Sequence, residues 1–496
     1  LFINCNQIIF EILIDKREMN RFDVCIIAAG EGSRLRSEGI KISKPLIKIN
    51  GEMMIARLFH VLEKYNPSAV HCIINEESYD LKSYLDQYEF KFPFHLTVKS
   101  TESSFHSFYE LSKHVRSDHF LLATTDSIFD EGEFEKFVKT YFEQKDNIDA
   151  KRKELALKAF AHTAHYDSVI YSRLWSRWKP NTFPDYWGLA FEKISDLRYG
   201  ENPHQRGALY GRFDPAPSSL ANAEKLWGKE LSYNNLLDSN NALSIVRDFQ
   251  KPCVTIVKHI NPCGVAIGET IEEAWHTAYS SDPMSAFGGI VAFNRELSAE
   301  IAQGMRKIFL EVIIAPSVAP EALDILKKKK DRRIIVTGPL EPHVKGWDFK
   351  NIEGGLLLQD KDNARVTREQ LKVVTERTPT KSEYEAMLFG ANLLKRVRSN
   401  TILFTNSIQT VGIGAGQMSR VDAVKIAGEK SRGRSSGCAM ASDAFFPFRD
   451  GIDVAHEFGI TAVIQAGGSV RDQEVIDAAN EHNMTMVFSG TRAFWH

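Results

Sequence analysis

Apolar residues along this chain fall into short runs that alternate with stretches of helical spacing. Residues 24–29 are all apolar, which is typical of a central strand buried on both faces. Residues 155–166 carry apolar side chains at the spacing of one helix face. From there to the end, runs such as 254–257 again alternate with helical patterns. The pattern predicts an α/β protein.

Length and composition suggest how this pattern is divided. A chain of 496 residues is too long for one core, so two or three domains are expected. The charged segment 143–153 predicts a boundary between a first domain, 21–148, and a second, 151–496. The formal net charge of −2 gives no reason to expect nucleic acid or an anionic membrane as a partner. Six cysteines without a Cys-x-x-Cys pair indicate a reduced, cytoplasmic protein.

The first residues are apolar up to Leu13, but Glu11 and Asp15 interrupt them. They have no basic lead and no small-residue cleavage site, so neither a signal peptide nor a membrane span is predicted. Met19 stands just before the first domain. We expect residues 1–20 to be an upstream or non-native extension.

A glycine-rich loop follows the first apolar run. It reads Gly30-Glu31-Gly32-Ser33-Arg34, with Lys44-Pro45 further on. A strand, a glycine loop and basic residues together predict a backbone cradle for phosphates, with Arg34 and Lys44 as charge partners. The glycine spacing fits neither the dinucleotide fingerprint nor the P-loop.

Residues 21–145, with the text AAGEGSRLRSEGIKISKPLIKINGEMMI, resemble the sugar-phosphate nucleotidyltransferases. The resemblance implies a Rossmann-like nucleotidyltransferase-type segment whose loop binds a nucleoside triphosphate, with Mg²⁺ held at a strand-end aspartate if the segment is active. The residues it implies are Gly30, Gly32, Arg34, Lys44 and Asp126. The sugar-binding half of that family does not follow here, so we expect a retained fold without catalysis.

Lys258 and His259 stand side by side at the end of the apolar run 254–257, before an expected Asn261-Pro262 turn. Two adjacent proton-handling groups predict acid–base chemistry. The segment partly matches the zinc nucleobase deaminases, which use His-x-Glu and Pro-Cys-x-x-Cys. Here Asn261 replaces the glutamate and Ala266 replaces the second cysteine. We therefore predict no zinc and no other metal at this segment.

Five further segments each allow a structural and a ligand-binding interpretation. Segment 197–205 is either a solvated turn or an anion-binding loop. Segment 232–241 opens a helix with four asparagines, of which capping explains one. Glycines in segment 282–289 indicate either a turn or a place where a ligand approaches the backbone closely. The glycine-rich segment 411–420 could be a phosphate cradle at a helix N-terminus. Segment 442–450 sets three aromatic residues around a proline, for core packing or for a flat heteroaromatic ligand.

Together with Lys258-His259, Arg398-Ser-Asn-Thr and the C-terminal TRAFWH, these segments resemble part of one family in unbroken order from about 151 to 496. It is the bifunctional purine-biosynthesis family, and the part is its phosphoribosylaminoimidazolecarboxamide (AICAR) formyltransferase. The resemblance implies two linked cytidine-deaminase-like α/β/α units without zinc. It implies formyl transfer from the cosubstrate 10-formyltetrahydrofolate to the 5-amine of AICAR, and a homodimer with composite active sites.

The resemblance also implies roles for individual residues. His259 would be the base for the amine, Lys258 would stabilise the oxyanion, and Asn400 would orient the formyl group. AICAR contacts would be Arg198, Tyr199, His204, Asn235, Gly288, Glu311, Arg420, Phe445, Arg492 and His496. Folate contacts would be Met284, Phe287, Phe448 and Gly467, the last within the loop 466–469.

One departure from the family is large. Its IMP cyclohydrolase domain precedes the formyltransferase, and here the nucleotidyltransferase-like segment does, so ring closure to IMP is not expected. Two alternatives remain open. One is a sugar-phosphate nucleotidyltransferase centred on Lys44 and Asp126. The other is a purine- or folate-binding protein without catalysis.

Overall fold

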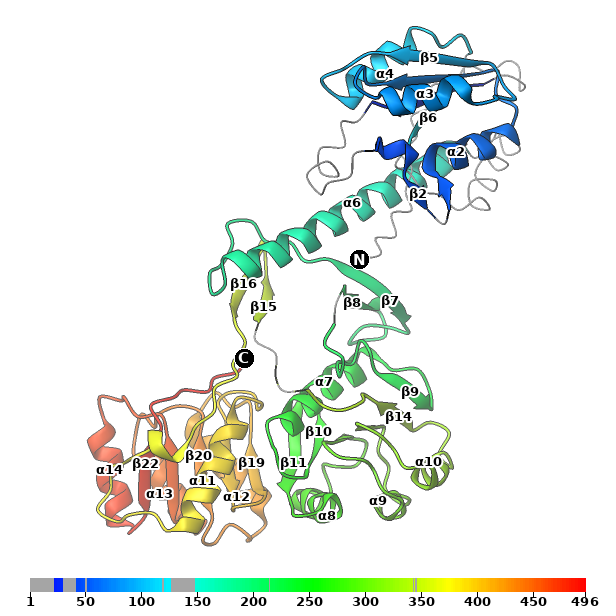
Figure 1. The fold of residues 1–496 in the computed structure, drawn as a ribbon. Coiled ribbons are helices and arrows are strands. Elements are labelled where there is room, and N and C mark those ends of the chain that lie inside the picture. The colour runs from blue at the N-terminus through cyan, green and yellow to red at the C-terminus, as the bar shows by residue number, and fades with distance from the viewer. Residues whose placement is uncertain are drawn as a thin grey trace. The chain divides into compact units, whose positions relative to one another are not determined.

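The computed structural model describes residues 22–29, 42–49, 51–117, 120–125, 148–213, 215–341, 343 and 346–496. The chain divides into two compact units, unit 1 (Leu1–Ala190) and unit 2 (Phe191–His496), and each is described by itself (Figure 1). Within the described ranges, we find no helix that is both long and apolar enough to cross a membrane.

Unit 1 is built on a four-stranded parallel sheet in the order β5-β4-β1-β6. Strand β1 (Asp23–Ala28) lies between two neighbours and is buried at every residue, which confirms the strand that its apolar run predicts. Its single acid, Asp23, accepts hydrogen bonds from the amides of Arg116 and Ser117. The other elements are η1 (Lys44–Leu46), β2 (Lys48–Ile49), β3 (Glu52–Met53), α2 (Met54–Glu63), β4 (Ala69–Ile74), α3 (Tyr79–Gln87), β5 (Phe94–Val98), α4 (Ser104–Ser112), β6 (Phe120–Thr124) and α6 (Ile148–Trp178).

Helix α6 contains the helical pattern of residues 155–166 and also the charged residues that end segment 143–153. After the helix the chain turns back along its last turns, where the Ser172 hydroxyl donates to the Gly188 carbonyl and the Trp175 indole donates to the Thr182 carbonyl. The compact units divide after this return, between Ala190 and Phe191. The domain boundary near residue 150 stays a prediction.

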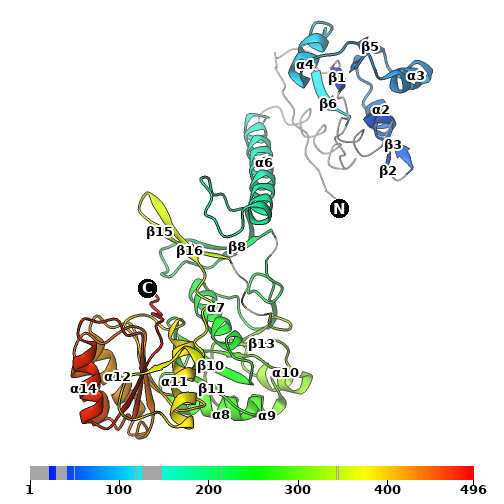
Figure 2. The same ribbon diagram turned by 60° about the vertical axis from the view of Figure 1, so that its left-hand side comes forward.

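Unit 2 contains two six-stranded mixed sheets with the same topology, which Figures 1 and 2 show from two directions. Their strand orders are β11-β10-β12-β13-β14-β9 and β19-β18-β20-β21-β22-β17. In each sheet the first two strands form an antiparallel hairpin, and the third strand pairs antiparallel with the second. The third, fourth and fifth strands are parallel to one another, and the last strand pairs antiparallel at the edge. The first sheet with α7–α10 is called the first lobe, and the second with α11–α14 the second lobe.

The bounds of these elements follow the apolar runs of the sequence. The first lobe comprises β9 (Glu224–Trp227), α7 (Tyr233–Arg247), β10 (Cys253–Lys258), β11 (Asn261–Ile267), α8 (Ile271–Ser281), β12 (Ile290–Phe293), α9 (Ala299–Gly304), β13 (Val312–Ala315), α10 (Pro320–Leu326) and β14 (Arg333–Val336). The second comprises η3 (Arg368–Gln370), β17 (Lys372–Val373), α11 (Lys381–Leu394), β18 (Ile402–Thr405), β19 (Thr410–Gly414), α12 (Arg420–Ser431), β20 (Ala439–Ser442), α13 (Asp450–Glu457), β21 (Ala462–Gln465), α14 (Asp472–Glu481) and β22 (Thr485–Phe488). Two separate hairpins are β7–β8 (Phe191–Leu197, Gly207–Arg212) and β15–β16 (Trp347–Ile352, Gly355–Asp360).

Each sheet is covered by helices on both faces, and the lobes share one of the resulting cores. Alternate residues of β10 face opposite ways, because side chains of a strand alternate. Val257 joins a cluster that contains residues of both α7 and α11, whereas Ile256 packs in the cluster that contains α8. Phe249 and Phe389 meet across the shared core, with ring centroids 5.2 Å apart. The fold class is α/β, with two α/β/α lobes, as the sequence predicts.

A buried charge group also joins the lobes. Asp248, at the end of α7, lies 2.8 Å from Arg396 Nε and 3.3 Å from Lys395 Nζ, at the end of α11. Burial alone would raise the pKa of Asp248, but the hydrogen bond from His343 and the charges of Arg396 and Lys395 lower it to about 2. This carboxylate therefore stays ionised and paired at neutral pH.

In each lobe, glycines let a helix approach the outer strand of the hairpin. A Cβ on Gly264 of β11 would lie 2.2 Å from the Ala278 carbonyl of α8, and one on Gly412 of β19 would lie 2.0 Å from the Ala427 carbonyl of α12. Gly414 is equally close to α12. The glycines at 412 and 414 thus serve strand–helix packing, a role that the sequence did not indicate.

Substitution Gly412→Ala is expected to destabilise unit 2 by about 1–3 kcal/mol, because the new methyl group pushes α12 from the sheet. Urea unfolding monitored by circular dichroism measures this. Gly355→Ala at the start of β16 is the matched control, since its Cβ would lie 3.9 Å from Ile352, an ordinary van der Waals distance. Equal stability of the two variants would refute the packing role.

Candidate active site

Lys258 and His259 lie where β10 turns into β11. Lys258 ends β10 and pairs with Asn261, so His259 and Ile260 are the two central residues of the hairpin turn. Both have positive φ, 53° and 69°, as a type I′ turn requires. The turn therefore precedes Asn261-Pro262, which begin β11, and the expected Asn-Pro turn is wrong. Pro262 is tolerated there because the hairpin register shifts beside it, opposite Val257.

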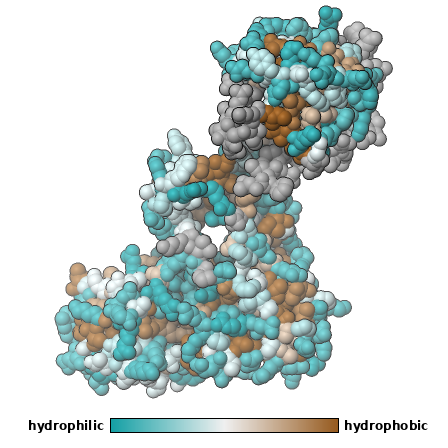
Figure 3. Space-filling view, in the orientation of Figure 1, coloured by the Kyte–Doolittle hydropathy of each residue, from teal (hydrophilic) through white to brown (hydrophobic). Residues whose placement is uncertain are grey.

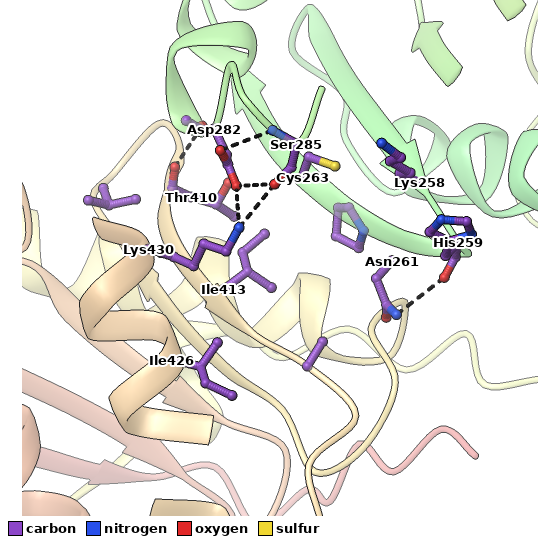
Figure 4. Close-up of a pocket in the computed structure, with 15 residues that line it drawn as sticks. Lys258, His259, Asn261, Cys263, Asp282, Ser285, Thr410, Ile413, Ile426 and Lys430 are labelled. Atoms are coloured by element: carbon purple, nitrogen blue, oxygen red, sulfur yellow. Dashed lines mark hydrogen bonds and ion pairs between the residues drawn. The ribbon is translucent and has the colours of Figure 1, made fainter. Parts of the chain in front are cut away.

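A cavity of about 290 Å³ lies beside the pair, lined by residues of both lobes. Figure 4 shows Lys258 and His259 on one side, with Asp282 and Lys430 on the other. Lys430 Nζ donates to Asp282 Oδ2 at 2.9 Å and to the Ser285 hydroxyl at 3.0 Å. Burial would raise the pKa of Asp282, but hydrogen bonds from Ser285 and Lys430 hold it below the ordinary value. This ion pair fixes segment 282–289 to α12.

Cys263 also lines the cavity. Burial, together with the charge of Asp282, raises the pKa of its thiol to about 12. A thiol with this pKa is not a nucleophile at neutral pH. Lys258 and His259 also border the cavity and lie outside the Lys430–Asp282 ion pair, which makes them the candidate acid and base there.

Several predicted residues gather around the pair in the first lobe. Lys258 Nζ donates to the Phe287 carbonyl at 2.8 Å. Gly288 follows with φ 74°. Asn235 lies in the first turn of α7, and its side-chain Nδ2 donates to Glu311 Oε2 at 3.0 Å. The structure thus brings the predicted residues Lys258, Phe287, Gly288, Asn235 and Glu311 to one end of this sheet.

The loop that follows β7 is tied to the same region. The side-chain Nδ2 of Asn234 donates to the Glu201 carbonyl at 3.2 Å. This bond holds the loop that carries Arg198, Tyr199 and His204 against the start of α7. The Arg198 guanidinium lies 5.5 Å from the Tyr199 ring centroid.

A second group of predicted residues is centred on Asn400 in the second lobe. Asn400 Oδ1 accepts from Arg420 Nη2 at 3.0 Å, and its amide donates to the Met418 carbonyl at 3.1 Å. Arg420 is also paired with the fully buried Asp443. The Ala493 amide donates to the Asp443 carbonyl at 2.8 Å, which brings the C-terminal segment with Arg492 to this group. At the terminus, the His496 carbonyl accepts from Lys350.

Aromatic and apolar side chains of the predicted folate contacts are exposed. Met284 is 73% exposed, Phe287 62% and Phe448 48%. Phe448 lies 4.8 Å from the Arg471 guanidinium, next to the loop with Gly467, whose φ is 74°. The aromatic residues of segment 442–450 therefore divide. Phe446 is core, whereas Phe445 and Phe448 reach the surface.

Four residues that hold this site were not predicted from the sequence. They are Asp238, Asn241, Asp443 and Lys430. The surplus of asparagines in 232–241 was a usable signal, because Asn235, Asp238 and Asn241 recur at a spacing of three on one face of α7. Asp443 and Lys430 had no such signal, since their partners are far along the chain.

The predicted nucleotide site of unit 1 lies mostly outside the described residues. Gly30, Gly32, Arg34 and Asp126 fall there. Lys44 begins η1, and the expected strand before Asp126 is present as β6. Among the described parts of the chain, no three His, Cys, Asp or Glu side chains are placed to hold a metal. The expected absence of zinc stays a prediction that metal analysis would test.

Two family models match the chain and overlap along it. The AICARFT/IMPCHase bienzyme model matches residues 123–430, and the MobA-like NTP transferase domain model matches residues 24–171. The bifunctional purine biosynthesis protein PurH of Lysinibacillus sphaericus (strain C3-41) is 48% identical over 345 residues, 70% of this chain and 67% of that protein.

Two solved structures are also similar to about a quarter of the chain. HddC from Yersinia pseudotuberculosis is 21% identical, covering 24% of this chain and 54% of that one, with a TM-score of 0.22. The inositol-1-phosphate CTP transferase from T. maritima is 19% identical, covering 24% and 49%, also with a TM-score of 0.22. At these TM-scores neither bears on fold or function.

The family model spans more than half of the chain and includes Lys258, His259 and Asn400, and the Lysinibacillus relative is 48% identical over 70% of the chain. Of the two family models, the NTP transferase domain model alone covers residues 24–122. The chain belongs to the AICARFT/IMPCHase bienzyme family of purine biosynthesis and carries an N-terminal MobA-like NTP transferase domain.

Proposed function

We propose that this chain is an AICAR formyltransferase that uses 10-formyltetrahydrofolate. The observation that carries the proposal is the Lys258–His259 pair, held on a hairpin turn beside a cavity that both lobes line. Family membership supports it. So do the exposed aromatic side chains of the predicted folate contacts, since flat rings bind to such surfaces.

The proposed reaction forms one C–N bond and breaks another. The 5-amine of AICAR attacks the formyl carbon, and His259 takes the amine proton as the bond forms. Lys258 stabilises the oxyanion of the tetrahedral intermediate and supplies a proton to N10 of the folate as the old C–N bond breaks. The products are formylated AICAR and tetrahydrofolate. Asn400, fixed by Arg420, orients the formyl group.

The test is an assay of the purified full chain with AICAR and 10-formyltetrahydrofolate, with tetrahydrofolate release as the readout. Release that depends on AICAR supports the proposal, and a folded protein without release refutes it. IMP is measured in parallel. We propose that this chain does not close the ring, because its residues ahead of 123 match the NTP transferase model instead. IMP above an enzyme-free blank would refute this second point.

We also propose a homodimer with composite active sites. Lys258 bonds to Phe287, whereas Asn400 bonds to Met418 and Arg420, and among the described residues these hydrogen bonds share no partner. Hairpins β7–β8 and β15–β16 expose Phe191, Ile194, Tyr210, Ile352 and Leu357, which a second copy would cover. Figure 3 shows apolar residues, in brown, among polar ones on the surface of unit 2.

Coexpression of two inactive chains tests the composite site. Chains with His259→Ala and Asn400→Ala are each expected to be inactive, but their heterodimers hold one intact site, so about a quarter of wild-type activity returns if chains pair at random. Activity no greater than that of either variant alone, in a confirmed dimer, would show that one chain supplies both residues.

The second candidate is a nucleotidyltransferase activity of unit 1, favoured by the MobA-like model match over residues 24–171. Pyrophosphate release from a nucleoside triphosphate and a sugar phosphate, lost in Lys44→Ala, would support it. No release with any of the four nucleoside triphosphates and a panel of hexose phosphates would count against it.

A further inference from the structure

The turn that carries His259 has a backbone its sequence disfavours. Ile260 has φ 69° and His259 has φ 53°. Glycine, asparagine and aspartate accept this left-handed region, whereas a β-branched residue such as isoleucine is strongly disfavoured there. Such a conformation persists only where neighbouring groups enforce it. The turn therefore needs partners outside itself.

Asp238 of α7 supplies two of these partners. Its Oδ2 accepts from the His259 amide at 3.1 Å, and its Oδ1 accepts from the Ile260 amide at 2.6 Å. Each carboxylate oxygen thus takes one of the two amides that the left-handed backbone directs away from the hairpin. Burial raises the pKa of Asp238, and the two amide hydrogen bonds oppose that rise. Burying a carboxylate costs desolvation free energy, and here the two hydrogen bonds from the turn offset part of that cost.

Asn241, one turn further along α7, holds the other side of the turn. Its side-chain Nδ2 donates to the Ile260 carbonyl at 2.5 Å and to the Arg396 carbonyl of the second lobe at 3.0 Å. Asn261 Oδ1 accepts from the Arg398 amide at 3.0 Å, two residues before Asn400. The turn is therefore connected both to α7 and to the segment that leads to Asn400.

Helix α7 is itself fixed at its start. Ser232 and Asn235 form a reciprocal capping box there, and the Asn235 amide also bonds to Glu311. The helix thus offers a rigid support for Asp238 and Asn241.

We propose that Asp238 is a positioning residue, which holds His259 at its catalytic place by enforcing the left-handed turn at His259 and Ile260. Asp238 stabilises the left-handed conformation at position 260 through hydrogen bonds, whereas a glycine there would adopt it without a steric penalty. The inference rests on the proposed formyl transfer and adds to it a residue that touches no substrate. Asn241 supports the same turn from its carbonyl side.

The experiment compares Asp238→Asn, Ile260→Gly, the double variant and the control Asn240→Ala in steady-state formyl transfer. Asn240 is an exposed residue of the same helix. Asp238→Asn presents an NH₂ group to one of the two amides, so we expect kcat to fall about 10²-fold, as for a reacting group misplaced by about 1 Å, with KM for AICAR little changed. Ile260→Gly and Asn240→Ala should stay near wild type.

The double variant is the decisive one. Glycine removes the penalty of the left-handed conformation, so kcat should recover by about tenfold relative to Asp238→Asn. A double variant as slow as Asp238→Asn, or an Asp238→Asn chain with wild-type kcat, overturns the inference. If Asp238→Asn fails to fold, the double variant should restore folding and activity together, and its failure to do so overturns the inference as well.

A second measurement separates this inference from the proposed function. Hydrogen exchange of the peptide that contains His259 and Ile260 should be faster in Asp238→Asn than in Asn240→Ala, whatever reaction the chain catalyses. If the wild type transfers no formyl group, the proposed function fails, and the exchange result alone decides whether Asp238 holds the turn. Equal exchange rates would overturn it.

Discussion

His259→Ala is expected to lower kcat for formyl transfer by about 10²–10⁴-fold, the usual loss when a general base is removed. The AICAR amine is conjugated with its ring and is a poor nucleophile, so its proton must leave as the formyl carbon is attacked. His259 is the imidazole beside the cavity, on a turn that Asp238 holds. Initial rates of tetrahydrofolate release at saturating AICAR measure the effect.

The matched control for this variant is His276→Ala. His276 is an exposed histidine of α8 in the same lobe. Its rate should equal that of the wild type. A His259→Ala chain that is folded and retains wild-type kcat would contradict the assignment of the base.

Asp443→Ala is expected to destabilise unit 2 by about 3–5 kcal/mol, because it leaves the Arg420 cation buried without its partner. Asp443 is fully buried, and the Arg420 side chain is 8% exposed. The carboxylate also accepts from the Thr401 amide at 3.0 Å, so the substitution removes a partner from the segment next to Asn400. Urea unfolding followed by circular dichroism measures the loss.

Asp422→Ala provides the comparison on the same helix as Arg420. Its ion pair with Lys425 is more than half exposed on both sides, and exposed pairs contribute less than about 1 kcal/mol. A loss for Asp443→Ala as small as that for Asp422→Ala would show that Arg420 finds another partner or water. In that case Asn400 would not depend on the Arg420–Asp443 pair for its orientation.

The sequence predicted the strands better than the turns between them. Runs such as Val254–Val257 are apolar enough to indicate buried strands, and β10 is there. The turn after it was predicted at Asn261-Pro262 from the usual preference of asparagine and proline for turns. It falls instead at His259 and Ile260, because a distant carboxylate enforces a conformation that local preference opposes.

The family resemblance implies two α/β/α units, but the residue pattern by itself does not show that their sheets share one strand order. A strand order is a property of pairing between distant segments, and different apolar residues can fill equivalent positions in a core. Gly264 and Gly412 are one trace of the repeat that is identical in both lobes, since each admits a helix against the outer hairpin strand. From the sequence, Gly412 is also consistent with a phosphate-binding loop, and only the position of α12 shows its packing role.

In the structure the predicted site residues of unit 2 lie mainly in two groups, one around Lys258 and one around Asn400. The sequence motifs identified the members of each group, but not the residues that fix them. Asp443 and Lys430 act through partners that lie more than a dozen residues away in the chain, so only the fold reveals them. The asparagines of α7 were the exception, because their number exceeded what a helix cap requires.

The most direct test of the central claim follows the formyl group itself. Purified full-length protein is incubated with AICAR and 10-formyltetrahydrofolate that carries ¹³C in the formyl carbon, and the products are identified by mass spectrometry. We expect labelled formyl-AICAR in equal amount to tetrahydrofolate, and an initial rate of labelling about 10²–10⁴-fold lower with His259→Ala. Folded wild-type protein that leaves AICAR unlabelled would contradict the account.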